Sequence, residues 1–148
     1  VVIAVLAYLN ETDKQRRQYT MELALEFFAG DRQTAKDRLY YTIDDVQRAV
    51  APAVLGPSDL RVYLSKSTGG GAPRDLTSAL LAVSGFFNSA ERCVRAGLCD
   101  EALMRQLIGE DAGAIRCVFS GVLEGMADSS NVRGLSSGLA FFDEGDCA

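Results

Sequence analysis

DLTSALLAVSGFFNSAERCVRAG, residues 75–97, carries the clearest helical pattern of this sequence. Apolar side chains recur there every three to four residues, which places them on one face of an α-helix. They are Leu76, Leu80, Val83, Phe87, Ala90 and Val94, with Leu81 and Phe86 widening the stripe. Asp75 suits the N-cap position, and Gly97 suits the position just past the C-terminus. The stretch therefore predicts a buried helix at the centre of an all-α domain.

The residues that follow predict two more helices and a tail. Asp100 can cap a helix over residues 101–108, which Gly109 would end. A last helix over residues 111–127 should bury Ile115, Phe119 and Val122 against Leu80, Val83 and Phe87 of the central helix. Residues 128–148 are rich in Ser, Gly and acids, and they predict a flexible acidic tail.

Shorter helices are expected before residue 75. The pattern predicts one helix over residues 1–29, a second over 32–42, a short one from Asp44 and Asp45 to Pro52, and another over 60–64. Residues 65–74 contain three consecutive glycines and predict a linker. A phosphate-binding loop is not indicated, because Lys66 precedes those glycines instead of following them. No stretch alternates long enough for a sheet, so we expect a helical bundle over residues 19–127.

Residues 1–9, VVIAVLAYL, form an apolar run without a charge. At 1.5 Å per residue the run covers only about 13 Å, whereas a spanning helix needs about twenty apolar residues. It fits the end of a membrane anchor that starts upstream, a helix buried in the core, or a signal-peptide remnant. Lys14, Arg16 and Arg17 follow it, and basic flanks mark the cytoplasmic side of a membrane. We therefore expect residues 1–18 to be the end of an anchor and its stalk. This predicts a single-pass protein of the inner membrane with its domain on the cytoplasmic side.

Charge and composition exclude several functions. The net charge is −5, with twenty acids against fifteen Lys and Arg, which disfavours binding to nucleic acid. The absence of histidine from the sequence removes His-based catalytic triads and His metal sites. Glu22, Glu26, Asp44 and Asp45 are spaced like acids on solvated helix faces. We therefore predict no enzymatic activity, no catalytic, cofactor-binding or metal-binding residue, and no cofactor.

The four cysteines are Cys93, Cys99, Cys117 and Cys147. None forms a CxxC pair, and Cys93 and Cys117 lie among apolar residues, where thiols commonly act as small hydrophobes. Cys93 and Cys99 lie six residues apart across a helix end, so their side chains are expected to diverge. All four are predicted to be reduced, as suits a cytosolic domain.

The run GFFNSAERCVRAGLCDEALMRQLIG, residues 85–109, resembles a small bacterial helical family known as DUF4760. The similarity lies in the Phe-Phe start of one helix, its basic end closed by glycine, and the Leu-x-Asp-Glu opening of the next. The front half is similar too, with its apolar helix, Phe27 and Phe28, and the second helix around residues 35–39. Over roughly residues 1–125, the resemblance implies a membrane-anchored helical fold and assigns no activity.

These observations favour a membrane-anchored helical module that binds or scaffolds proteins, such as an accessory subunit of a membrane complex. Its expected partners are another protein or a second copy, bound through helices, and membrane lipid, bound through the N-terminal helix. The alternative is a homo-oligomeric, channel-like or membrane-perturbing effector in bacterial stress or phage defence.

Overall fold

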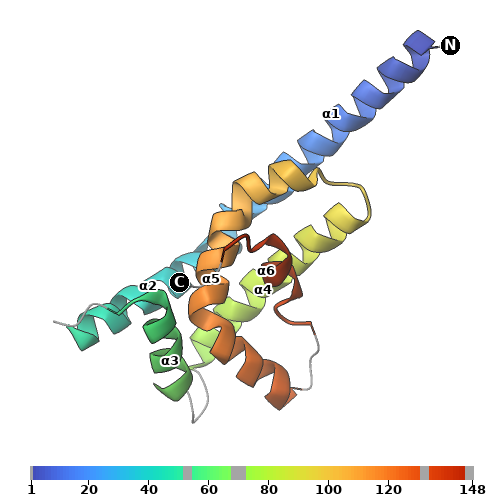
Figure 1. Cartoon of the computed structure of the whole chain (residues 1–148). Helices are drawn as coiled ribbons and strands as arrows, with labels where there is room; N and C mark the ends of the chain where they lie inside the picture. Colours follow the sequence, from blue (N-terminus) through green and yellow to red (C-terminus); the bar gives the residue numbers. More distant parts are fainter. Residues whose placement is uncertain (1, 52–54, 68–72, 131–133, 146–148) are drawn as a thin grey trace.

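A computed structural model describes residues 2–51, 55–67, 73–130 and 134–145, and within these ranges the chain forms six α-helices and no strand (Figure 1). The helices are α1 (Val2–Phe27), α2 (Gly30–Val50), α3 (Pro57–Ser67), α4 (Arg74–Arg95), α5 (Glu101–Ser130) and α6 (Ser137–Phe142). The predicted all-α fold is confirmed. None of the described helices is both long enough and apolar enough to cross a bilayer. The membrane-spanning part of the prediction stays a prediction.

The core is centred on α4, as its periodicity predicts. Leu80, Val83 and Phe87 are fully buried, and Ile115 and Phe119 of α5 are buried with them. The main neighbours of α4 are α2 and α6, while α5 packs chiefly against α3 and α6. The burial predicted for these positions is confirmed, but Leu81, which the stripe included, is 48% exposed. The expected direct packing of α5 on α4 is only a minor contact, because α6, which the sequence did not indicate, supplies much of the cover over α4.

Two predicted helix breaks are wrong. Residues 30–50 form the single helix α2, in which Asp44 pairs with Arg48 one turn later at 2.6 Å instead of opening a new helix. Likewise α5 runs through Gly109 without interruption. Gly109 lets another segment come close: a Cβ there would lie 3.4 Å from the carbonyl oxygen of Phe142. A glycine that serves packing and one that ends a helix look the same in sequence.

Of the two predicted N-cap residues, Asp100 is confirmed and Asp75 is not. Asp100 accepts a hydrogen bond from the Leu103 amide at 2.9 Å, which confirms it as the cap of α5. Asp75 instead lies in the first turn of α4 and forms an ion pair with Arg38 of α2. Its acidic charge still suits the positive end of the helix dipole.

The expectation of a flexible tail from residue 128 is wrong for residues 137–142, which form α6 against α4. Leu139 and Phe142 are fully buried there. Gly138 makes the contact possible, because a Cβ at this position would lie 2.1 Å from the carbonyl carbon of Phe87. Asn88 holds the two helices together: its Oδ1 accepts from the Gly138 amide at 2.7 Å. A short helix of small residues thus stays in place through tertiary contacts.

Glu91 ties α6 to α4 and gives the fold a dependence on pH. Its carboxylate accepts hydrogen bonds from Ser137 Oγ and Arg95 Nε, both at 2.7 Å. The Ser137 bond first, and then the bond and charge of Arg95, hold the pKa of Glu91 below its usual value. A carboxyl whose pKa is lowered by folding stabilises the protein above the unfolded pKa, and that stability is lost as the pH falls through the folded pKa.

We therefore expect the melting temperature to fall as the pH drops below about 4.3, the ordinary pKa of glutamate. Glu91→Gln should be less stable at pH 7 and should lose less stability over the acidic range. Thermal unfolding followed by circular dichroism at a series of pH values measures both. Equal slopes for the two proteins would show that Glu91 does not contribute.

Candidate functional site

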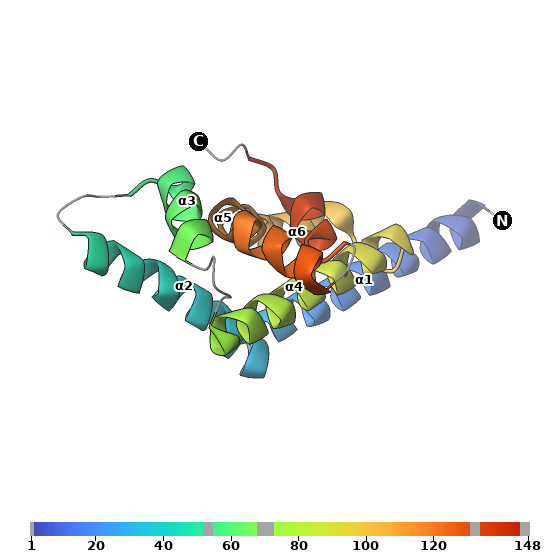
Figure 2. The same cartoon turned by 90° about the horizontal axis from the view of Figure 1, so that it is seen from below.

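Residues 2–9, here called the N-terminal arm, form an apolar helical surface that is exposed to solvent. Its large side chains are between 51% and 83% exposed: Val2, Ile3, Val5, Leu6, Tyr8 and Leu9. Because consecutive positions are exposed, the apolar surface surrounds the helix and leaves no polar face. Figures 1 and 2 show this end of α1 projecting beyond the other helices. The alternative that this run is a core helix of the same domain is therefore wrong.

The arm continues into a charged band and then into the bundle. Glu11, Asp13, Lys14, Arg16 and Arg17 follow within two turns. The first fully buried side chain of α1 is Thr20, followed by Ala24 and Phe27. Deeper in the core the Phe27 ring stacks on Phe86 with 4.7 Å between centroids.

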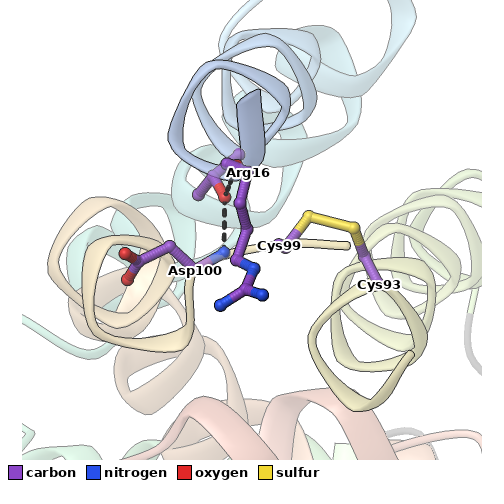
Figure 3. Close-up of a disulfide and its surroundings, with 5 residues drawn as sticks. Arg16, Cys93, Cys99 and Asp100 are labelled. Atoms are coloured by element: carbon purple, nitrogen blue, oxygen red, sulfur yellow. Dashed lines mark hydrogen bonds between the residues drawn. A yellow bond between two sulfur atoms is a disulfide. The ribbon is translucent and has the colours of Figure 1, made fainter. Parts of the chain in front are cut away.

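Thr20 joins α1 to the turn between α4 and α5. Its hydroxyl accepts a hydrogen bond from the Asp100 amide at 2.8 Å and donates one to the Arg16 carbonyl at 2.8 Å (Figure 3). Both roles of the hydroxyl are thus filled, as a buried hydroxyl requires. This contact sets where α1 leaves the bundle.

A disulfide between Cys93 and Cys99 closes that turn, so the prediction that these thiols are reduced is wrong (Figure 3). The reason is the left-handed Gly97, whose φ of +71° turns the chain back over the last turn of α4. The amides of Leu98 and Cys99 both donate to the Cys93 carbonyl, at 3.0 and 3.2 Å. The two Cα atoms come within 5.3 Å, inside the range that a disulfide spans. Cys117 is disulfide-bonded as well.

Alkylation tests the bridge directly. Treating the denatured, unreduced protein with iodoacetamide should leave Cys93 and Cys99 unmodified, and prior reduction should make both reactive. Mass spectrometry of the peptides reports the two states. Two alkylated residues without reduction would show that the bridge does not form.

A hollow of about 310 Å³, here called the junction hollow, lies between α1 and the α4–α5 turn. It is lined by Thr12, Gln15, Arg16, Tyr19, Gly97 and Leu98. Figure 3 shows the Arg16 side chain running from α1 toward the turn that carries Cys99 and Asp100. Arg16 Nε is buried and has no hydrogen-bond partner among the residues that the structure describes. Tyr19 and Leu98, by contrast, are 50% and 59% exposed. The hollow therefore combines a cation with an apolar lip.

A larger cavity of about 750 Å³ lies among α2, α3, α5 and residues 143–145. Small residues of α5, including Gly109, Gly113 and Ala114, form part of its wall. Asp143 and Glu144, on its wall, are used in ion pairs: Asp143 binds Arg116, and Glu144 lies 3.9 Å from Arg105. Glu110 of α5 also lines the cavity.

The acids considered as catalytic candidates do not converge. Glu22 accepts a hydrogen bond from Gln18, and Glu26 pairs with Arg32 at 2.7 Å. Asp44 and Asp45 lie exposed toward the far end of α2. Within the described ranges no group of three or more His, Cys, Asp or Glu side chains could hold a metal ion.

Tyr40 and the predicted linker over residues 65–74 were the other polar features to place. Tyr40 donates to Asp111 at 2.6 Å, and burial, followed by this hydrogen bond, raises the pKa of Tyr40. It is thus a protonated link between α2 and α5. Of the predicted linker over residues 65–74, residues 68–72 lie outside the described residues, and Lys66 belongs to the last turn of α3.

No family model, curated protein or solved structure matches the chain. The resemblance to DUF4760 stays a prediction. Sequence reasoning did not find the disulfide-closed turn between α4 and α5. Its parts were visible, because Gly97 was identified as a helix end, with Cys93 before it and Cys99 after it. Combining a left-handed glycine with two flanking cysteines would have indicated the bridge.

Proposed function

We propose that this chain is a membrane-anchored helical module that binds other proteins, with the N-terminal arm in lipid. The main support for this proposal is the arm itself, an exposed apolar helical surface that continues from a packed domain. Exposed apolar patches on soluble domains typically mark protein or membrane contacts. Burying an aliphatic side chain of this size contributes about 1.5–3 kcal/mol, so several together favour transfer out of water.

The length of the arm limits how it meets the bilayer. Eight residues cover about 12 Å, less than half of the roughly 30 Å hydrocarbon core. By itself the arm reaches into one leaflet and brings the charged band to the headgroups. Tyr8 then lies near the interface, where tyrosine is enriched.

The side of the membrane follows from two opposed signals. Lys14, Arg16 and Arg17 favour the cytoplasmic side, but Glu11 and Asp13 lie among them. The Cys93–Cys99 disulfide favours an oxidising compartment, since cytosolic thiols are kept reduced. We give the disulfide more weight and propose that the bundle lies on the oxidising side, in place of the cytoplasmic side that the sequence favoured.

The protein-binding part of the proposal has its own support on the outer face of α1. Met21 and Leu25 of α1, and Phe28 just after its last residue, are all at least 40% exposed. Their spacing of four and three residues places them on one stripe, the pattern of a helix that packs against another helix. We assign the role of partner to a protein that presents a helix, and no catalytic residue to this chain.

Two charge-introducing double variants separate the two surfaces. Ile3→Glu with Leu6→Glu should abolish flotation with phospholipid vesicles while leaving the bundle folded. Met21→Glu with Leu25→Glu should still float, and it should lose whatever protein co-purifies with the membrane-bound wild type. Light scattering of the detergent-solubilised wild type then reports whether that partner is a second copy. A wild-type protein that neither floats nor associates would refute the proposal.

A further inference from the structure

We propose that α1 binds the α1 helix of a second copy of this chain, side by side and in the same direction. The proposal rests on the protein-binding function above and names the partner within it. The two helices meet along one line of residues, here called the dimer seam. Its members alternate at steps of three and four residues, the repeat of a two-stranded coiled coil. They are Ala4, Ala7, Glu11, Lys14, Gln18, Met21, Leu25 and, just after the helix, Phe28.

The dimer seam lies on a side of α1 that the bundle leaves uncovered. All of its residues are exposed, whereas the bundle-facing side is marked by the buried Thr20, Ala24 and Phe27. Successive residues of a helix are turned by about 100°, so Met21 points more than a quarter of a turn away from Thr20. In Figure 2, α1 lies at the edge of the molecule. Two copies can therefore meet along the seam while their bundles stay to the sides.

The charges beside the seam favour a parallel pair. Arg17 lies on one flank and Glu22 on the other, in the g and e positions of a coiled coil. In a parallel pair each g residue faces the next e residue of the other helix, so Arg17 of each copy meets Glu22 of the other. Both residues are exposed, and neither takes part in an ion pair within the part of the chain that the structure describes.

An antiparallel pair would bring each flank against the same flank of the other copy. Glu22 and Glu26 would then face an acidic surface, and Arg17 would face no acid of that flank. Juxtaposed like charges disfavour an arrangement. A parallel pair is also the arrangement in which the arms of both copies can enter one bilayer.

The N-terminal arm continues the seam with its two small residues. Ala4 and Ala7 are the only small side chains among residues 1–9, and both lie on the seam. The larger side chains of the arm occupy the other helical positions. Helix interfaces in lipid are enriched in small residues, which let the two backbones approach closely. The pattern of the arm thus supports the same pair independently of the charges.

The middle of the seam is polar, with Glu11, Lys14 and Gln18 between the two apolar ends. Polar residues at the core positions of a coiled coil lower its stability but fix its register and its number of strands. We therefore expect a dimer of modest affinity and a single register.

Single introduced cysteines test the geometry of the pair in the whole chain. Gln18→Cys and Leu25→Cys place a thiol at two seam positions, and Glu26→Cys is the matched control on the exposed surface beside the seam. The proteins are oxidised with copper phenanthroline in mild detergent, and covalent dimers are counted on a non-reducing gel. The wild type, treated in the same way, accounts for the native cysteines.

Both seam variants should form a covalent dimer that reduction reverses, and Glu26→Cys should form much less. The two seam positions lie seven residues apart, a rise of about 10 Å along the helix. In an antiparallel pair, only one of them could meet its own counterpart. Circular dichroism confirms that each variant is folded.

Reversing the charges tests the partner contacts. Arg17→Glu alone and Glu22→Arg alone should each weaken the dimer roughly tenfold, because two ion pairs become two like-charge contacts. The protein with both changes should return to near the wild-type affinity, which the loss of a structural contact within one copy does not predict. Sedimentation equilibrium in density-matched detergent measures the dissociation constants.

The outcomes separate this proposal from the function on which it rests. Cross-linking at only one seam position, or equal cross-linking at Glu26→Cys, would refute the seam. If the wild type is monomeric in detergent but another protein co-purifies with it, the second copy is refuted as the partner and the protein-binding function stands. If the wild type associates neither with itself nor with another protein, both proposals fall.

Discussion

Phe87→Ala is expected to lower the free energy of unfolding by about 3–5 kcal/mol, the range for truncating a buried phenylalanine. The ring is fully buried where three helices meet. It packs edge-on against Phe27 of α1 at 5.2 Å between centroids and lies 6.3 Å from Phe142 of α6. Its removal leaves a cavity that these rings cannot fill without moving their helices.

Urea denaturation measures this loss, and Leu81→Ala is the matched control on the same helix. Leu81 is about half exposed, so its truncation should cost well under half as much. Similar losses at the two positions would mean that Phe87 is not at the centre of the core.

Gly138→Ala should destabilise the protein by about 3 kcal/mol or more, although it adds a single methyl group. The new Cβ would lie 2.1 Å from the Phe87 carbonyl carbon and 2.4 Å from the Asn88 nitrogen, both of them backbone atoms inside α4. The rigid backbone of α4 cannot move aside, so α6 must be displaced. The displacement exposes Leu139 and Phe142 and breaks the Gly138 amide bond to Asn88.

Gly85→Ala is the control for this change, because a Cβ at Gly85 of α4 meets nothing within 4 Å. There alanine should stabilise the helix by about 0.5–1 kcal/mol through its better propensity. The two glycine variants should therefore shift the urea midpoint in opposite directions. Equal small shifts would show that α6 does not pack closely on α4.

The sequence predicted α4 well because its pattern and its environment agree. Its apolar side chains from Leu76 to Val94 lie on one face of the helix, and the bundle buries most of that face, with Leu81 half exposed and Val94 partly buried. The N-terminal helix was also placed correctly, since its charge-free run and its packed half are both helical. Such elements can be predicted from local pattern alone.

The wrong predictions concern features whose structure depends on tertiary contacts. Gly109 is a helix-end signal in sequence, yet α5 runs through it, and the missing side chain leaves room for residue 142 to pack closely. A segment of six residues such as α6 is too short for its apolar side chains to define a period, and its place depends on Gly138 meeting α4. The disulfide depends on the direction in which Gly97 turns the chain, which the spacing of the two cysteines does not reveal.

The central claim is that the N-terminal arm enters a lipid bilayer, and a tryptophan in place of Tyr8 tests it most directly. Tyr8→Trp provides the single tryptophan of the chain and lies in the arm. With vesicles whose acyl chains carry bromine at a known depth, its emission should shift to the blue and be quenched by the bromine. A Leu81→Trp protein, labelled on the bundle, should keep its aqueous emission. An emission of the Tyr8→Trp protein that stays aqueous and unquenched would contradict the account.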